Sequence, residues 1–206
     1  PILIGVWDQA VTCSPSAQFW IPLSGDGPPL AEGLFEQLVY GAEGAFVGGT
    51  RSTLPLALQE RLIHEAAQIA SVLQAIGYFG RCSMDAVICN DTNAQPIVHW
   101  IECNARWGGM SIPMSLAKRF CEGSLPDGFL VTQQDCPLAP NLSTGEVLSR
   151  LEDMLFRPGG LREGLIILSP PRSDRGLFMN MLALASTHEE ARALVTRAAA
   201  RLGVHP

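Results

Sequence analysis

The 206-residue sequence has few charged residues and no excess of positive charge. Asp, Glu, Lys and Arg make up 17% of the chain, and the formal net charge is −6. An acidic chain of this kind argues against sequence-independent nucleic-acid binding, which depends on basic patches. Hydrophobic residues make up 47%. So high a hydrophobic content with so little charge also excludes intrinsic disorder.

Long uninterrupted apolar runs are absent as well. No stretch reaches the roughly 18 to 20 apolar residues of a membrane span, so no membrane partner is expected. The mean hydropathy of +0.19 therefore predicts a well-buried core. The sequence begins with Pro1 and not with Met, and residues 2–6 have the pattern of a core strand. We therefore expect a cytoplasmic protein, and a piece excised from a longer polypeptide.

The cysteines form no C-x-x-C pair. They lie in hydrophobic runs of a chain too long to need stapling, which favours buried free thiols over a disulfide framework. The histidines have no ligand-like spacing to the cysteines, so the spacing does not indicate a zinc site. The residues concerned are Cys13, Cys82, Cys89, Cys103, Cys121, Cys136, His64, His99, His188 and His205.

Other sequence features of enzymes are missing too. Residues 14–16 (Ser-Pro-Ser) lack the glycines of a nucleophile elbow, and no nucleophile–base pair is evident. Residues 48–50 (Gly-Gly-Thr) and the Gly108-Gly109 pair lack the lysine of a phosphate-binding loop. We expect these glycines at turns or at close backbone approaches.

Hydrophobic periodicity predicts an α/β chain, more narrowly α+β. The clearest helical signal covers residues 55–76, where Pro55 suits a first turn and Gly77 suits a left-handed cap. Ser186, followed three residues later by Glu189, predicts a capping box for the last helix. Strands are predicted at residues 1–23, 32–49, 79–88, 97–103, 164–168 and 177–185, and further helices at 113–121, 147–156 and 187–202.

Two of the predicted strands bring acidic residues together. If residues 82–89 and 97–104 form an antiparallel hairpin centred between Asn93 and Ala94, residues whose numbers sum to 187 lie opposite each other. Such pairs share a face of the sheet, about 4.5–5.5 Å apart. The opposed pairs are then Asp85 with Glu102, Ser83 with Asn104, and Val87 with Trp100. Along the second strand, Arg106 alternates onto the same face.

The opposed acids imply either a cation between them or that one of the two stays protonated. Two like charges about 5 Å apart cost about 3 kcal/mol at an effective dielectric near 20. Together with the amide oxygen of Asn104, the carboxylates of Asp85 and Glu102 form a set of hard oxygen ligands that suits Mg²⁺. Arg106 is then positioned to bind a phosphate or acyl-phosphate oxygen. The alternative is a solvated acidic face, in which a one-residue bulge puts the two acids on opposite sides.

Residues 102–106 (Glu-Cys-Asn-Ala-Arg), preceded by residues 77–85 and followed by Gly108-Gly109-Met110, resemble the second half of an ATP-grasp fold. This superfamily comprises carboxylate–amine ligases, and the resemblance covers roughly residues 1–120. It implies ATP and Mg²⁺ (or Mn²⁺) as cofactors. It also assigns roles to single residues: the metal ligands are Asp85, Glu102 and Asn104, the catalytic contact to phosphate is Arg106, and Asn104, Arg106 and Gly109 bind the nucleotide or acyl substrate.

The resemblance also implies an architecture. Residues 1–123 correspond to an ATP-grasp-like C-terminal lobe, a mainly antiparallel sheet with flanking helices, and residues 124–206 to a small α/β extension. The family's N-terminal lobe, with lysines for the nucleotide phosphates, is not found in these residues. In one branch an arginine precedes the aspartate by two residues; here that position is Ser83, and the nearest arginine is Arg81.

The function implied is the C-terminal part of an ATP- and Mg²⁺-dependent carboxylate–amine ligase of the peptide type. A small carboxylate would form an acyl phosphate, which an amine then displaces. The missing lobe of the same polypeptide is the expected partner, and the fragment alone is expected to be inactive. Two alternatives remain open: a non-catalytic ATP-grasp-like regulatory or interaction domain, and an enzyme of unrelated fold with a hydrolytic metal site.

Overall fold

A computed structural model describes residues 8, 10–41, 44–90, 95–136, 142–169 and 177–203, with side chains for all except 134–136, 177 and 178. The strand predicted at residues 2–6 lies outside this part. The chain divides into two compact units: unit 1 comprises Pro1–Gln37 and Ser52–Gly108, and unit 2 comprises Leu38–Arg51 and Gly109–Pro206. The predicted division into residues 1–123 and 124–206 stays a prediction.

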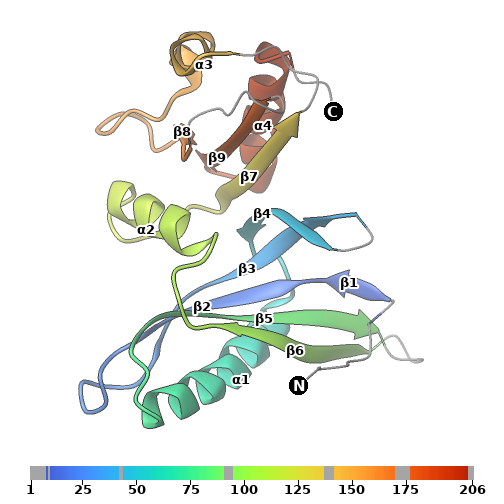
Figure 1. The fold of residues 1–206 in the computed structure, drawn as a ribbon, viewed down its shortest axis with the longest axis vertical. Coiled ribbons are helices and arrows are strands. Elements are labelled where there is room, and N and C mark those ends of the chain that lie inside the picture. Colours follow the sequence, from blue (N-terminus) through green and yellow to red (C-terminus); the bar gives the residue numbers. More distant parts are fainter. Residues whose placement is uncertain are drawn as a thin grey trace. The chain divides into compact units, whose positions relative to one another are not determined.

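Unit 1 is built on an antiparallel sheet (Figure 1). Its central strand, β5 (Gly80–Asn90), pairs with β1 (Val11–Cys13), with β2 (Pro15–Ile21) and with β6 (Pro96–Asn104). β2 pairs in turn with β3 (Leu30–Tyr40), whose last residues belong to unit 2. The strands predicted around residues 79–88 and 97–103 are therefore confirmed, and β5 has a neighbour on each side.

Helix α1 (Leu56–Ala75) covers one face of this sheet. Pro55 occupies the N-cap position, and Gly77 follows the helix with φ +96°. Glycine adopts this left-handed conformation without a steric penalty, so the predicted end of the helix is confirmed. The apolar side of the helix and the inward side chains of β2 and β5 form one core, which includes Ala17, Phe19, Ile21, Leu62, Ala66, Ala70, Cys82, Met84 and Ile88.

Unit 2 has its own antiparallel strands. β7 (Gly128–Cys136) pairs with β4 (Ala45–Arg51) and with β9 (Leu177–Ala185), and β9 also pairs with β8 (Gly164–Ile167). Helix α4 (His188–Arg201) packs against β7 and β9. The remaining elements are α2 (Ser111–Phe120), α3 (Thr144–Leu151) and the short 3₁₀ helix η1 (Glu152–Met154). The sequence analysis predicted no strand at β7.

Two helix starts differ from the prediction. The capping box of α4 uses Thr187 and Glu190, one residue later than expected, because the hydroxyl of Ser186 donates to Glu163 instead. Helix α3 begins three residues before the predicted position, at a second capping box formed by Ser143 and Glu146. A side chain can cap a helix only if its oxygen reaches the free N–H groups of the first turn, and local contacts decide which one does.

The fold class is as predicted: a mainly antiparallel sheet with flanking helices, of α+β type. All strand pairings given for the described residues are antiparallel apart from an isolated parallel bridge between Leu155 and Leu165. Among the helices of the described residues, none combines the length and the apolar character that a membrane crossing requires.

Candidate functional site

The β5–β6 hairpin of unit 1 brings the predicted acidic residues together. Asp85 lies opposite Glu102, and Ser83 lies opposite Asn104, as the register summing to 187 predicts. Between Asp85 and Ala86 the register shifts by one residue, so Ala86 pairs with Trp100 and Val87 with His99. The predicted pairing of Val87 with Trp100 is therefore wrong.

This register shift has a clear physical reason. Trp100 packs against the core beneath α1, and its indole N–H donates to Glu65 at 2.9 Å. In an uninterrupted hairpin, a Trp100 side chain on the core side would turn Glu102 to the core side as well, because alternate residues share a face. One extra residue in β6 lets Trp100 face the core while Glu102 stays opposite Asp85.

Asp85 is a buried carboxylate, only 8% exposed. One carboxylate oxygen accepts a hydrogen bond of 2.6 Å from the Ser16 hydroxyl, and the other accepts one of 3.0 Å from the Asn104 amide. Burial raises the pKa of Asp85, hydrogen bonds from Ser16, Gln37 and Asn104 lower it, and the nearby charge of Glu102 raises it; the net direction is upward. The charged form of Asp85 therefore has a free-energy cost in the folded state.

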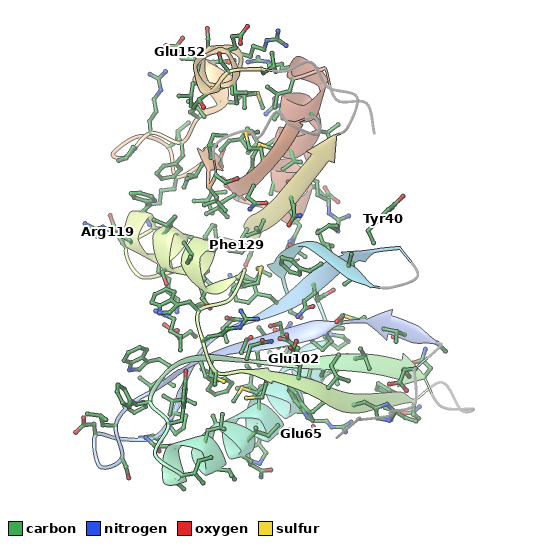
Figure 2. All side chains as sticks on the ribbon, viewed as in Figure 1. Tyr40, Glu65, Glu102, Arg119, Phe129 and Glu152 are labelled. Atoms are coloured by element: carbon green, nitrogen blue, oxygen red, sulfur yellow. The ribbon has the colours of Figure 1, made fainter. Side chains whose placement is uncertain are left out.

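The other members of the set line the same face of the hairpin. Glu102 is exposed on β6 (Figure 2), and Asn104 is partly buried beside it. The arrangement offers two carboxylates and one amide within one strand pairing. Hard oxygen donors of this kind suit Mg²⁺, which is usually bound by one or two carboxylates together with water and substrate phosphates.

The two remaining predicted residues lie beyond β6. Arg106 is exposed, and its guanidinium donates to the carbonyl of Trp107 at 3.2 Å. Gly109 belongs to unit 2, where a Cβ added to it would lie 3.1 Å from the ring of Phe46, so this glycine allows a close approach. Their roles toward phosphate or acyl substrate stay predictions.

Sequence reasoning missed the side chains that support Asp85. Ser16 lies directly opposite Asp85 on β2, and the amide of Gln18 donates to the Ser16 hydroxyl at 2.9 Å. Both residues are almost fully buried, at 2% and 3% exposure. The signal in the sequence was the alternation of Ser16 and Gln18 with apolar Ala17 and Phe19, but only the pairing of β2 with β5 relates it to Asp85.

Arg81 is engaged at the start of β5. It forms an ion pair with Glu32, and its guanidinium lies 5.8 Å from the ring centre of Trp20 and 4.8 Å from that of Trp107. Trp107 directly follows Arg106 in the chain. The contact between Arg81 and Trp107 therefore fixes the segment that carries Arg106.

Replacing Trp107 with alanine is expected to destabilise unit 1 by about 1 kcal/mol, because the cation–π contact with Arg81 is lost. Urea unfolding of Trp107→Ala, Arg81→Met and the double variant measures the coupling between them. We expect the double variant to be less destabilised than the sum of the two single variants. Strictly additive losses would show that the ring and the guanidinium do not interact.

The five cysteines with described side chains are free thiols, but the expected burial holds for three of them, Cys82, Cys89 and Cys121. Cys82 is buried, Cys103 is exposed, and their sulfur atoms lie 3.5 Å apart. Burial, followed by the hydrogen bond and charge of Cys103 and then the charge of Asp85, raises the pKa of Cys82 to about 12. At neutral pH Cys82 is therefore a protonated thiol and not a nucleophile.

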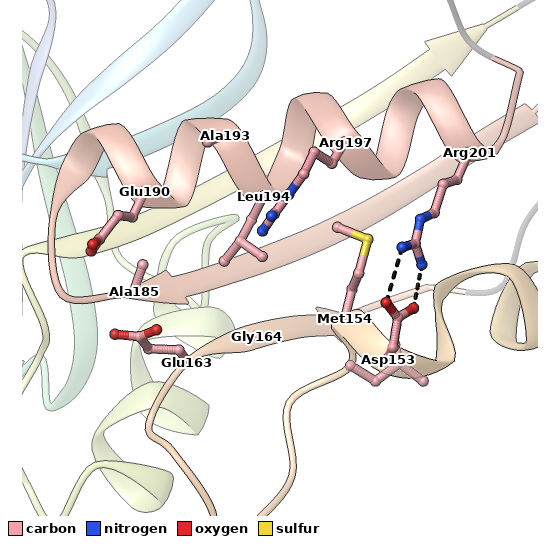
Figure 3. Close-up of a pocket in the computed structure, with 11 residues that line it drawn as sticks. Asp153, Met154, Glu163, Gly164, Ala185, Glu190, Ala193, Leu194, Arg197 and Arg201 are labelled. Atoms are coloured by element: carbon pink, nitrogen blue, oxygen red, sulfur yellow. Dashed lines mark hydrogen bonds and ion pairs between the residues drawn. The ribbon is translucent and has the colours of Figure 1, made fainter.

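A separate pocket of about 420 Å³ lies in unit 2 (Figure 3). It is lined by residues of α4 and of the segment from Asp153 to Gly164, together with Ala185. Arg201 and Asp153 form an ion pair across it, with Arg201 Nη2 2.9 Å from Asp153 Oδ2. The described residues that line this pocket include none of the predicted site residues.

Most of the chain is similar to several solved structures. Biotin carboxylase from Campylobacter jejuni, crystallised as a βγ-ATP complex, matches 95% of this chain over 46% of its own, with a TM-score of 0.61 and 15% identity. N5-carboxyaminoimidazole synthetase from Staphylococcus aureus, complexed with ADP, matches 93% over 50%, with a TM-score of 0.50 and 14% identity.

A third similar structure is the biotin carboxylase domain of 2-oxoglutarate carboxylase from Hydrogenobacter thermophilus, crystallised with MgADP, ADP and bicarbonate. It matches 90% of this chain over 44% of its own, with a TM-score of 0.56 and 14% identity. The chain thus spans half the length of these three structures or less. At such identities the likeness shows a shared fold. No protein-family model and no curated protein matches the sequence.

Proposed function

We propose that this chain, which has the ATP-grasp fold, is the C-terminal part of a ligase. The ligase would depend on ATP and Mg²⁺ and would join a carboxylate to an amine. The observation that carries the proposal is the buried carboxylate of Asp85, directly opposite Glu102 and hydrogen-bonded by Asn104. Two opposed carboxylates repel each other and do not stabilise the sheet, whereas a cation bound between them would offset this repulsion.

The three residues fit a magnesium ion through their chemistry. Asp85, Glu102 and Asn104 would hold the ion, and Ser16 keeps the carboxylate of Asp85 in one orientation through a 2.6 Å hydrogen bond. A bound Mg²⁺ would neutralise charge on the phosphates of ATP. The exposed position of Glu102 leaves one side of the set open to a nucleotide.

Two residues after β6 would contact the phosphate and the acyl group of the substrates. Arg106 would bind a phosphate or acyl-phosphate oxygen through its guanidinium. The backbone N–H of Gly109 would contact the acyl substrate. In this reaction the substrate carboxylate would attack the γ-phosphate of ATP and release ADP, and the amine would then displace inorganic phosphate from the acyl phosphate. The enzyme orients the reactants and stabilises charge, and no covalent enzyme intermediate is required.

The proposal also includes a second lobe. The chain covers half or less of the similar structures, so we propose that a preceding lobe of the same cytoplasmic polypeptide supplies the remaining nucleotide contacts. Small-molecule acids and amines would be the substrates. The 206 residues alone are then expected not to turn over ATP.

The test is ATP consumption by the complete polypeptide with Mg²⁺ and a panel of small acids and amines. Glu102→Gln keeps the shape of the side chain but removes its charge, and we expect kcat to fall about 100-fold or more, since metal contacts contribute several kcal/mol. Glu60→Gln, an exposed position on α1, is the matched control and should keep its activity. Unchanged turnover in Glu102→Gln would reject the proposed metal role.

The same assay addresses the regulatory alternative. A domain that keeps the fold without catalysis would give no acid- and amine-dependent ATP consumption in the wild type. If Asp85 and Glu102 do not bind Mg²⁺ in such a domain, Glu102→Gln would leave nucleotide binding unchanged when it is measured by calorimetry in the presence of Mg²⁺. Loss of Mg²⁺-dependent nucleotide binding without wild-type turnover would instead assign a binding role to the site.

A further inference from the structure

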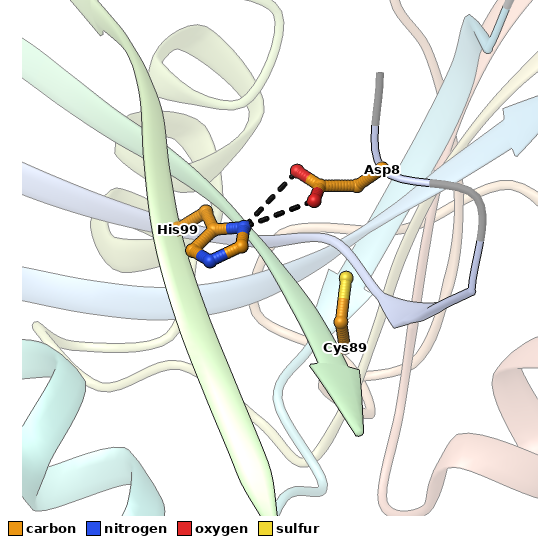
Figure 4. Close-up of side chains that lie close together, drawn as sticks. All are labelled: Asp8, Cys89 and His99. Carbon is orange, nitrogen blue, oxygen red and sulfur yellow. Dashed lines mark hydrogen bonds and ion pairs between the residues drawn. The ribbon is translucent and has the colours of Figure 1, made fainter. Parts of the chain in front are cut away.

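Unit 1 contains a second group of metal-ligating side chains, separate from the Asp85 set. Asp8 precedes β1, Cys89 lies near the end of β5, and His99 lies on β6 (Figure 4). One potential ligand atom from each residue lies within 4.8 Å of the others. The Nδ1 atom of His99 is 3.0 and 3.1 Å from the two carboxylate oxygens of Asp8. It is the one such group of three that the described residues contain.

Strand pairing explains why these residues meet. Cys89 lies opposite Ile97 on β6, so His99, two residues further along, is its diagonal neighbour on the same face of the hairpin. On the other side of β5, Val11 pairs with Cys89, and the segment that carries Asp8 therefore runs past the cysteine. The extra residue in β6 lies between Trp100 and Glu102, and through it His99 comes to share this face with Cys89.

The position is distinct from that of the acid pair. Cys89 follows Asp85 by four residues in one strand, a separation of about 13 Å along β5. The group includes sulfur and imidazole nitrogen, whereas the Asp85 set contains oxygen donors only. The two sites therefore differ in location and in the class of ion that each would bind.

We propose that Asp8, Cys89 and His99 form a binding site for a zinc-type divalent transition-metal ion. Zinc is bound by cysteine sulfur, histidine nitrogen and carboxylate oxygen, and a site with three protein ligands completes its coordination with water. Binding replaces the thiol proton of Cys89, which passes to solvent, while His99 binds as the neutral imidazole.

The exposure of the three side chains suits such a site. Cys89 is 9% exposed, whereas the side chains of Asp8 and His99 are 26% and 48% exposed. An ion can therefore reach the group from solvent while its thiolate ligand is shielded. Because the ligands come from three segments, the ion would tie the chain before β1 to the hairpin and stabilise unit 1. The cysteine and histidine spacings in the sequence gave no indication of this grouping.

The test is a Co²⁺ titration of the complete polypeptide after chelator treatment, since Co²⁺ replaces Zn²⁺ and reports thiolate ligation by a charge-transfer band. We expect the band to appear in the wild type, to be bleached by added Zn²⁺, and to persist in excess Mg²⁺. Cys89→Ser should lose the band, and His99→Gln and Asp8→Asn should weaken Co²⁺ binding about tenfold or more. Zn²⁺ should raise the unfolding temperature of the wild type more than that of His99→Gln.

Cys103→Ser is the matched control, because the neighbouring thiols of Cys82 and Cys103 offer a competing thiolate site. The proposal expects the band to survive in this variant and in Glu102→Gln. It is overturned if the wild type gives no band, if Cys89→Ser retains it, or if Cys103→Ser removes it. Since the side chain of His99 is about half exposed, His99→Gln tests the site even if Cys89→Ser folds poorly. The outcome does not depend on ligase activity.

Discussion

Asp85→Asn is expected to stabilise the metal-free protein while it abolishes Mg²⁺-dependent nucleotide binding. The pKa of Asp85 is raised in the folded state, and burial is the largest cause. The charged form of Asp85 therefore destabilises the folded state at neutral pH. Removing that charge should therefore increase both the free energy of unfolding and the unfolding temperature of the metal-free protein. A functional carboxylate that lowers stability is a common compromise in binding sites.

The pH dependence gives the sign of this effect. Because the pKa of Asp85 is higher in the folded than in the unfolded state, the wild type loses stability as pH rises from the ordinary carboxyl pKa through the raised value. The stability difference between Asp85→Asn and wild type should therefore be close to zero in acid. It should grow as Asp85 ionises and stay constant above its folded-state pKa.

Thermal unfolding with and without Mg²⁺ and ATP checks both expectations for Asp85→Asn, the higher stability without metal and the loss of Mg²⁺-dependent nucleotide binding. Asp26→Asn, at an exposed turn, is the control for the loss of one acidic charge, and we expect it to leave both measurements unchanged. If Asp85→Asn lowered the stability of the metal-free protein, the buried charge of Asp85 would not be destabilising. If it kept a full Mg²⁺-dependent response to ATP, Asp85 would not be a metal ligand.

Gly48→Ala is expected to destabilise unit 2 by about 3–5 kcal/mol, the largest loss of stability predicted here. Gly48 has φ +149°, and a Cβ at this position would lie 2.1 Å from the carbonyl oxygen of Val131 on β7. No real Cβ approaches a backbone atom so closely, so β4 would have to separate from β7. The pairing of Gly48 with Thr132 and the hydrogen bond from Thr50 to Phe129 would be disturbed together.

A second glycine separates the steric clash from the backbone strain. Gly159 has φ +82° and open space around the position of an added Cβ, so Gly159→Ala should cost only about 1 kcal/mol. Thermal unfolding should show a decrease of about 10 °C or more for Gly48→Ala and a few degrees for Gly159→Ala. Equal decreases would mean that the close approach of β4 to β7 has little weight.

The hairpin illustrates how far sequence reasoning reached. Loop position and alternation predicted that Asp85 lies opposite Glu102, and the structure confirms this pairing, but the register next to the loop differs by one residue from the predicted one. Only the extra residue between Trp100 and Glu102 brings Glu102 opposite Asp85. The same arithmetic failed beyond Asp85, since the extra residue depends on Trp100 packing under α1, a contact distant in sequence. Strand β7 was missed for a related reason: its partners β4 and β9 lie far from it along the chain.

Local chemistry along the chain determined the helical and strand segments, the end of α1 at Gly77 and the adjacency of β5 and β6, because each depends on neighbours within one element or hairpin. The exact pairing of Asp85 with Glu102 depends on the extra residue in β6, and therefore on the packing of Trp100 under α1. The support of Asp85 by Ser16, the contacts of Arg81 with two tryptophans and the meeting of Asp8, Cys89 and His99 were decided only by the tertiary structure. These contacts join segments that are tens of residues apart. Which such segments become neighbours is set by the order of strands in the sheet, a property that no short stretch of sequence carries.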